Sequence, residues 1–260
     1  MHLSRTRFSA VGGSSSGRKE DIVAEFLAPR KRSRRAIVLC DGLPTVPSKR
    51  VLMEFFSKKG FWVFHPRYRG SWESGGELLK YSPAKDIAGV VEGVCKGFKN
   101  PWSRKVVRLR PKEIYIIGTS FGGAAALLLS RHPKVTAVVA VSPVVDWTKP
   151  SKDEPFDRFV GFVRRAFGEA YRGKLSSWKK LKSGKFYNPA AEIKKLNGKK
   201  IFIIHAKDDR TVLWKPVAEF AKQAGAQLFM LKRGGHMSSA ILARPRFYGK
   251  INKYFKKFKN

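Results

Sequence analysis

The sequence predicts an α/β protein with a mostly parallel central sheet, helices on both faces and a small helical cap. Two observations indicate this fold class. From about residue 35 onward, short apolar runs typical of buried strands alternate with segments of helical periodicity, which is the pattern of parallel strands joined by helices. The alternation breaks at 147–190, which predicts a core formed by 1–146 and 191–260 and a helical cap or lid inserted at 147–190. A chain of 260 residues is long enough for one domain with a substantial core.

Strands are predicted where apolar residues form alternating or continuous runs. The N-terminal stretch MHLSRTRFSAVGGSSSG is basic and then rich in glycine and serine, and we interpret it as a flexible or early-strand segment. The segment 21–29 alternates and is expected to form a hairpin with the segment after it. The run RAIVLC is apolar throughout its interior and ends at the turn DGLP. The predicted strands are 21–29, 35–40, 61–65, 113–118, 134–142, 200–206 and 226–232.

Helices are predicted where apolar residues recur three or four positions apart, often with proline near the start or glycine at the end. The predicted helices are 47–60, 82–98, 121–132, 156–168, 214–225 and a C-terminal docking helix with a basic outer face. The aromatic side chains of the cap are expected to form its own core, with one or two of them lining a pocket. These aromatics are Phe156, Phe159, Phe162, Phe167 and Trp178.

The charge of the chain is strongly unbalanced, with 54 Lys and Arg against 19 Asp and Glu and a formal net charge of +35. Such a field attracts polyanions without regard to their sequence. The basic residues are spread along the chain, so a general compositional bias and a selected anionic partner both remain open. The basic cap also suggests a preference for anionic substrates. We interpret the loop RKRSRR at 30–35 as a solvated hairpin loop rather than a localisation signal.

No apolar run approaches the roughly 18 residues of a membrane span, and the N-terminus lacks the apolar region of a secretory signal. A cytoplasmic protein without a membrane span is therefore expected. Cys40 and Cys95 have no metal-ligand spacing and lie in apolar runs, which favours buried free thiols and no metal site. The sequence indicates no cofactor and no particular oligomeric state.

Ser120 is the candidate nucleophile. It lies in the stretch IIGTSFGGAA, where a strand ends at Gly118 and a helix begins after the serine. Because the turn is tight, side chains at 118 and 122 would collide with neighbouring elements, so glycine is needed at both. The turn exposes the serine hydroxyl, and the amide of Phe121, at the helix N-terminus, can donate to an oxyanion.

A serine hydroxyl needs a base to take its proton and an acid to orient that base. Both residue types come after later strands, in the chain order Ser, Asp, His. The stretch IFIIHAKDDRTV ends a strand in two carboxylates, Asp208 and Asp209, and FMLKRGGHMSS places His236 after the last predicted strand. The glycine pair before His236 gives its loop the flexibility to reach inward. The sequence therefore predicts a catalytic triad at one edge of the sheet.

These motifs together resemble the α/β-hydrolase superfamily, and within it the prolyl-oligopeptidase-related esterases and peptidases. The resemblance implies the α/β-hydrolase fold over residues ~35–257. In that family the acid lies three residues before the valine of a DxxV motif, which selects Asp209, with Val212 after it, over Asp208; the latter is expected to face solvent or to pair with a cation. The resemblance rests on YRGSWESGG, GTSFGG, SPVVDW, IIHAKDDRTV and GGH.

The resemblance also implies a second oxyanion donor, the amide of Leu43 in LCDGLP, where Asp41 replaces the histidine common in the family. We expect Asp41 to be held by Arg69 or another nearby base. His65 and His205 are interpreted as structural residues. Cys40 lies near the site but lacks a partner base, and Asp146 in VVDW is interpreted as part of a structural turn.

The leading functional prediction is a serine hydrolase that cleaves small or medium carboxylic esters with Ser120, Asp209 and His236. Hydrolysis of peptides or aminoacyl groups is the first alternative, although oligopeptidases of the family usually carry a large N-terminal propeller for which we expect no room in this chain. The second alternative is a polyanion-binding protein that uses a hydrolase scaffold with weak or lost catalysis.

Overall fold

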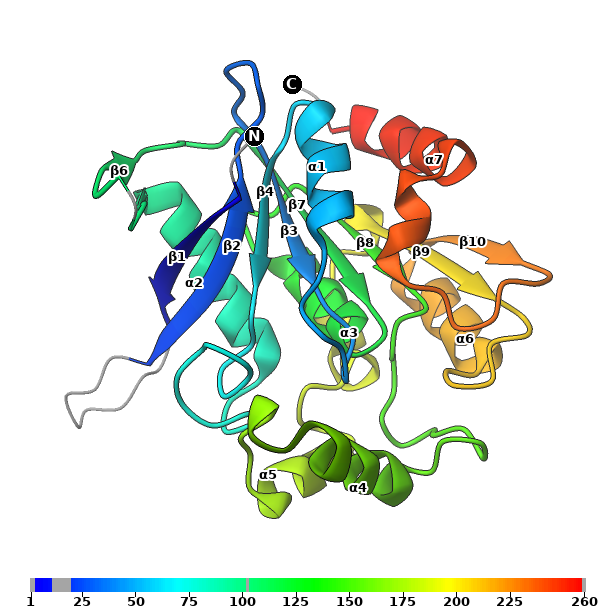
Figure 1. Cartoon of the computed structure of the whole chain (residues 1–260). Helices are drawn as coiled ribbons and strands as arrows, with labels where there is room; N and C mark the ends of the chain where they lie inside the picture. The colour runs from blue at the N-terminus through cyan, green and yellow to red at the C-terminus, as the bar shows by residue number, and fades with distance from the viewer. Residues whose placement is uncertain (1–2, 11–19, 102, 259–260) are drawn as a thin grey trace.

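The computed structural model describes residues 3–10, 20–101 and 103–258, and within them eight strands form one sheet (Figure 1). In spatial order these strands are β1 (Ser4–Ser9), β2 (Asp21–Leu27), β4 (Trp62–Pro66), β3 (Arg35–Cys40), β7 (Glu113–Thr119), β8 (Ala137–Val141), β9 (Ile201–Ala206) and β10 (Gln227–Leu231). The pairs from β4 to β10 are parallel, whereas β2 is antiparallel to both β1 and β4. A separate small hairpin is formed by β5 (Phe98–Lys99) and β6 (Val106–Val107).

Helices cover both faces of the sheet. The described α-helices are α1 (Arg50–Lys58), α2 (Pro83–Lys96), α3 (Phe121–Leu128), α4 (Phe156–Phe167), α5 (Leu175–Lys179), α6 (Trp214–Ala224) and α7 (Pro245–Lys256). Helices α2, α3 and α6 cover one face, and α1 and α7 cover the other (Figure 1). The buried side chains of the first three helices belong to one core, and those of α1 and α7 belong to the second. Strand β3 serves both cores, because Val38 faces the first and Ile37 the second. None of the described helices is both long enough and apolar enough to cross a bilayer.

The α/β fold class with a mostly parallel sheet is confirmed, but the predicted hairpin between 21–29 and the segment after it is wrong. Strand β2 pairs with β1, which precedes it, and with β4; β4 lies between β2 and β3. The reason is that β3, α1 and β4 form a crossover unit that places β4 directly beside β3. Of the predicted N-terminal segment, Ser4–Ser9 is a strand, and 11–19 lies outside the described residues.

Residues 147–190, which the sequence predicts to form a cap and which we call the cap segment, lie beyond the carboxyl ends of the parallel strands and carry α4 and α5 (Figure 1). Main-chain hydrogen bonds attach it to the loop 68–81: the amide of Arg172 donates to Gly70 and the amide of Leu78 donates to Arg172, each at 2.7 Å. Trp178 is fully buried within this segment. The attachment fixes one end of the cap over the edge of the sheet where the candidate residues lie.

Candidate active site

Ser120 occupies a strained turn between β7 and α3. Its φ of 51° lies in the left-handed region that disfavours residues with a side chain. The flanking glycines are required sterically. A Cβ on Gly118 would lie 2.2 Å from the carbonyl oxygen of Gly122, and a Cβ on Gly122 would lie 2.3 Å from the carbonyl oxygens of Cys40 and Asp41. The turn therefore holds the serine at the mouth of a cavity, where its side chain is partly exposed.

The end of β8 anchors both the serine turn and the histidine loop. The amide of Ser120 donates to the carbonyl of Val141 at 3.1 Å, and the amide of Met237 donates to the hydroxyl of Ser142 at 3.1 Å. Adjacent residues of one strand end thus bind the chain at position 120 and immediately after His236. Ser142 begins the motif SPVVDW, but no role was predicted for its hydroxyl, because a serine after a buried strand carries no distinct signal.

Asp209 and His236 lie together at the carboxyl edge of the sheet. The Nδ1–H of His236 donates to Oδ2 of Asp209 at 2.9 Å, and Oδ1 of Asp209 accepts the amides of Thr211 and Val212. Burial raises the pKa of Asp209, but the hydrogen bond and charge of His236 outweigh it and hold that pKa below its ordinary value. The carboxylate is therefore ionised at neutral pH and fixes the histidine with its Nε2 directed away from Asp209.

Asp208 faces solvent, as expected, and it also has a role that the sequence analysis missed. Its Oδ1 accepts the amides of Gly234 and Gly235, each at 2.9 Å. These amides belong to the loop that carries His236. The two neighbouring aspartates therefore have different roles. Asp209 binds and orients the imidazole of His236, and Asp208 binds the backbone of the loop that carries it.

The two predicted oxyanion donors lie beside the serine. Phe121 is the first residue of α3 and directly follows Ser120. A Cβ built on Gly42 would lie 3.3 Å from the Cβ of Ser120, which places the loop of Leu43 against the turn at Ser120. Both Leu43 and Phe121 line the same cavity as Ser120. The carbonyl of Phe121 accepts the hydroxyl of Tyr187 at 2.7 Å, so the cap segment also braces the start of α3.

Asp41 is not held by Arg69, contrary to the first partner that we expected, but by His65 and Lys49. Oδ2 of Asp41 lies 2.6 Å from Nε2 of His65, and Oδ1 lies 3.1 Å from Nζ of Lys49. Burial raises the pKa of Asp41, but these two bases lower it below its ordinary value. Arg69 instead pairs with Glu20 and Asp86. The carboxylate of Asp41 is thus neutralised behind the loop of Leu43.

Three further interpretations concern residues close to the site. Asp146 accepts the amide and hydroxyl of Thr148 at 3.0 and 2.8 Å, which is the geometry of a capped turn. Nε2 of His205 donates to the carbonyl of Val212 at 3.0 Å and so supports the segment after Asp209. Cys40 is buried, and burial followed by the charge of Asp41 raises the pKa of its thiol, which keeps it protonated.

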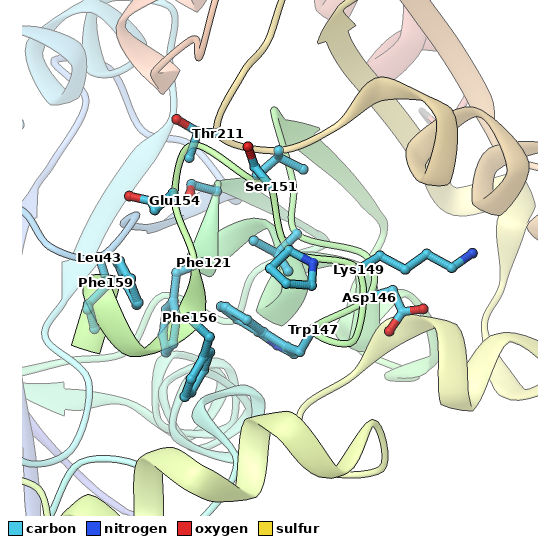
Figure 2. Close-up of a pocket in the computed structure, with 14 residues that line it drawn as sticks. Leu43, Phe121, Asp146, Trp147, Lys149, Ser151, Glu154, Phe156, Phe159 and Thr211 are labelled. Carbon is cyan, nitrogen blue, oxygen red and sulfur yellow. The ribbon is translucent and has the colours of Figure 1, made fainter. Parts of the chain in front are cut away.

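The cavity at Ser120 has a volume of about 70 Å³ and is mainly apolar. Figure 2 shows side chains that line it. Two of the five cap aromatics, Phe156 and Phe159, line it, whereas Trp178 is buried and Phe162 is exposed. Glu154 also lines the cavity and was not singled out from the sequence; the only signal was a carboxylate in a predominantly basic cap. Among the described side chains, no group of three or more His, Cys, Asp and Glu residues is arranged to hold a metal ion.

The sequence profile of the prolyl oligopeptidase family matches residues 47–259, which is most of the chain. A comparison with curated protein sequences gives no match.

Solved structures match almost the whole chain. An esterase of Pyrococcus furiosus superposes with a TM-score of 0.71 at 16% identity, over 99% of this chain and 91% of the esterase. An α/β hydrolase of a Penicillium species gives 0.71 at 14% identity, over 99% of both chains. An acylaminoacyl peptidase of Pyrococcus horikoshii gives 0.62 at 16% identity, over 99% of this chain and 41% of the peptidase. The α/β-hydrolase fold predicted from the sequence is therefore confirmed.

Proposed function

The chain belongs to the prolyl oligopeptidase family of serine hydrolases, and from this membership we propose that it cleaves carboxylic esters through an acyl-enzyme. The observation that carries the proposal is the hydrogen-bonded pair of Asp209 and His236, attached to the same strand end as the strained Ser120. A base oriented by a buried carboxylate is what a serine hydroxyl needs to become a nucleophile. The apolar cavity with two cap aromatics suits an acyl chain of small or medium size.

In the proposed reaction, Oγ of Ser120 attacks the ester carbonyl while Nε2 of His236 takes the hydroxyl proton. Asp209 accepts the Nδ1–H bond and stabilises the imidazolium that forms. The amides of Phe121 and Leu43 donate to the tetrahedral oxyanion. The carbon–oxygen bond to the alcohol then breaks, and the alcohol leaves with the proton from His236. Water attacks the acyl-enzyme with His236 as base, which releases the acid and restores Ser120.

A fluorophosphonate probe tests the nucleophile directly, because it reacts with an activated serine irrespective of the substrate. We expect labelling of the wild type, none in Ser120→Ala and strongly slowed labelling in His236→Ala. Absence of labelling in folded wild-type protein would contradict the proposal. A panel of p-nitrophenyl esters of increasing acyl length, with an aminoacyl anilide, then separates ester from peptide hydrolysis. Faster cleavage of the anilide than of every ester would favour the peptidase alternative.

A second candidate function is polyanion binding, and a cavity far from the serine supports it. This cavity, of about 440 Å³, lies between the loops 30–35 and 107–110. Its lining includes Lys31, Arg32, Arg34, Arg108 and Arg110 and no carboxylate. Within the described ranges, none of these five cations forms an ion pair with an acidic residue. Five cations that have no acidic partner in the described part of the chain provide, at one place, more local attraction for phosphate groups than the same charges dispersed over the surface.

The test compares neutralisation at two basic surfaces. Arg32→Gln with Arg34→Gln removes charge from the cavity, and Lys253→Gln with Lys256→Gln removes the same charge from helix α7. Localised binding predicts that the first pair weakens retention of single-stranded DNA more and reduces its salt dependence more than the second. Equal losses would instead indicate a general effect of net charge. Fluorophosphonate labelling of both variants serves as the check on folding.

A further inference from the structure

The cavity beside Ser120 differs in charge from the rest of the molecule. The chain has 54 Lys and Arg residues against 19 Asp and Glu. The described lining of the cavity reverses this balance, because it contains the carboxylates of Asp146 and Glu154 and a single base, Lys149. A substrate entering the cavity therefore meets a local charge opposite in sign to the net charge of the protein.

Glu154 is the charged group of this lining that lacks a partner. Asp146 accepts hydrogen bonds from its own turn and from Asn188. Lys149 lies 3.5 Å from Glu219 and extends away from the other labelled side chains in Figure 2, whereas Glu154 lies on the opposite side of the cavity. The Glu154 side chain is half-buried, and in the described part of the chain no hydrogen bond or ion pair reaches its carboxylate.

A partly buried carboxylate without a partner lowers the stability of the folded protein, because its charge has lost part of its hydration. Such a carboxylate is unexpected in a chain that has cations in excess. Neighbouring cationic side chains are present, since Arg210 pairs instead with the adjacent Asp153 at 2.6 Å. Glu154 lines the same cavity as Ser120, and the charges of His236 and Asp209 affect its pKa. A cationic group bound by Glu154 would consequently lie within a few bonds of an ester carbonyl placed at Ser120.

We propose that Glu154 makes the enzyme selective for esters that carry a cationic group, such as a protonated amine, within a few bonds of the scissile carbonyl. The inference rests on the proposed ester hydrolysis and names the substrate class of that site. The ligand supplies the ion pair that the chain leaves unmade, in an environment where solvent screens it incompletely. The basic side chains of the cap suggested anionic substrates, but Lys149 is the only one of them in the described lining.

Two pairs of isosteric esters test the proposal, because each pair differs in charge and hardly in shape. On the acyl side, p-nitrophenyl β-alaninate carries an ammonium where p-nitrophenyl butanoate carries a methyl group. On the alcohol side, butanoylcholine carries a quaternary nitrogen where 3,3-dimethylbutyl butanoate carries a quaternary carbon. The enzymes compared are the wild type, Glu154→Gln, Glu154→Lys and the matched control Glu169→Gln, which neutralises an exposed carboxylate of the cap segment outside the described lining.

We expect the wild type to favour the cationic ester of at least one pair by about tenfold in kcat/KM, which is the effect of one partly screened ion pair. The ratio of kcat/KM for the cationic ester to kcat/KM for the neutral ester should fall toward one in Glu154→Gln, fall below one in Glu154→Lys and stay at the wild-type value in Glu169→Gln. A wild-type ratio near one in both pairs, or an unchanged ratio in Glu154→Gln, overturns the proposal while Ser120-dependent hydrolysis stands. If no ester is cleaved and the fluorophosphonate does not react, the proposed function fails, and this inference fails with it.

Discussion

Stability in acid is predicted to depend on Glu25, a buried carboxylate on β2. Its Oε2 lies 2.9 Å from Nη2 of Arg67 and 3.5 Å from Nδ1 of His65, the same histidine that binds Asp41 behind the loop of Leu43. Burial raises the pKa of Glu25, but hydrogen bonds and charge from His65 and Arg67 outweigh it and lower the pKa from 4.5 to about 2. The perturbation that removes this titration is Glu25→Gln.

The size and sign of this effect on the unfolding free energy are set by the difference in the proton affinity of Glu25 between the folded and the unfolded chain. The folded protein binds the proton on Glu25 more weakly than the unfolded chain does, so the contribution is fully present above pH 4.5 and is lost as pH falls toward 2. At about 1.4 kcal/mol per pK unit, this interval corresponds to about 3 kcal/mol of unfolding free energy. Within the interval, the wild type should lose up to about 1.4 kcal/mol per pH unit more than Glu25→Gln loses.

Urea unfolding at several pH values between about 5 and about 2.5 measures this difference. Glu25→Gln leaves Arg67 without its closest partner, which lowers stability at every pH. The informative quantity is therefore how the gap, the difference in unfolding free energy between wild type and variant, changes with pH. We expect the gap to be largest near pH 5 and to narrow steadily in acid. Glu219→Gln, which changes an exposed carboxylate, serves as control and should run parallel to the wild type. A gap for Glu25→Gln that stays constant across the range would refute the reasoning.

Three other predictions concern the loop that carries His236, the turn at Ser120 and the cavity beside it. Asp208→Ala removes the acceptor of two loop amides and should lower kcat/KM about tenfold, whereas Asp208→Asn, which keeps an acceptor oxygen, should lose much less; equal losses would contradict the anchoring role. Gly122→Ala forces a Cβ to within 2.3 Å of the carbonyl of Cys40 and should lower the unfolding free energy by about 2 kcal/mol or more, measured in urea. Burial and the charge of Asp209 raise the pKa of Glu154 and the charge of His236 lowers it, and the net result is a raised pKa. As the pH is lowered, the preference for cationic esters should therefore begin to decrease at a higher pH than it would with a glutamate of ordinary pKa. Effects of pH that are common to both esters of a pair cancel in the ratio, and a ratio independent of pH would contradict the assignment.

The parts of the fold and site that the sequence predicts are those encoded by short stretches of chain. The alternation of apolar runs and helical segments indicated the fold class, and the tight turn at Ser120 is encoded by the glycines beside it. The order of Ser120, Asp209 and His236 along the chain, each after a strand, predicted that they meet at one edge, and the structure brings Asp209 and His236 to 2.9 Å. These inferences need only the rule that parallel strands end at the same edge of the sheet.

The remaining features depend on contacts between distant segments. His65 and Lys49 bind Asp41 across 24 and 8 positions of sequence, and no local pattern distinguishes them from Arg69 as partners. The position of β4 between β2 and β3 is likewise set by a crossover and not by the alternation within β2. The role of Asp208 depends on two backbone amides, which every residue except proline has, so residue types cannot reveal it.

The net charge of +35 and a cavity suited to cations are compatible because the two signs occupy different parts of the molecule. The carboxylates of Glu25, Asp41, Asp86 and Asp209 are buried. Exposed cations act on a ligand through solvent, which screens them beyond about 8 Å at physiological ionic strength. A half-buried carboxylate such as Glu154 is screened less and acts at contact distance. Local charge should therefore govern substrate choice, and net charge should govern encounter with polyanions. Added salt should consequently weaken DNA retention steeply and change the ratio between cationic and neutral esters much less.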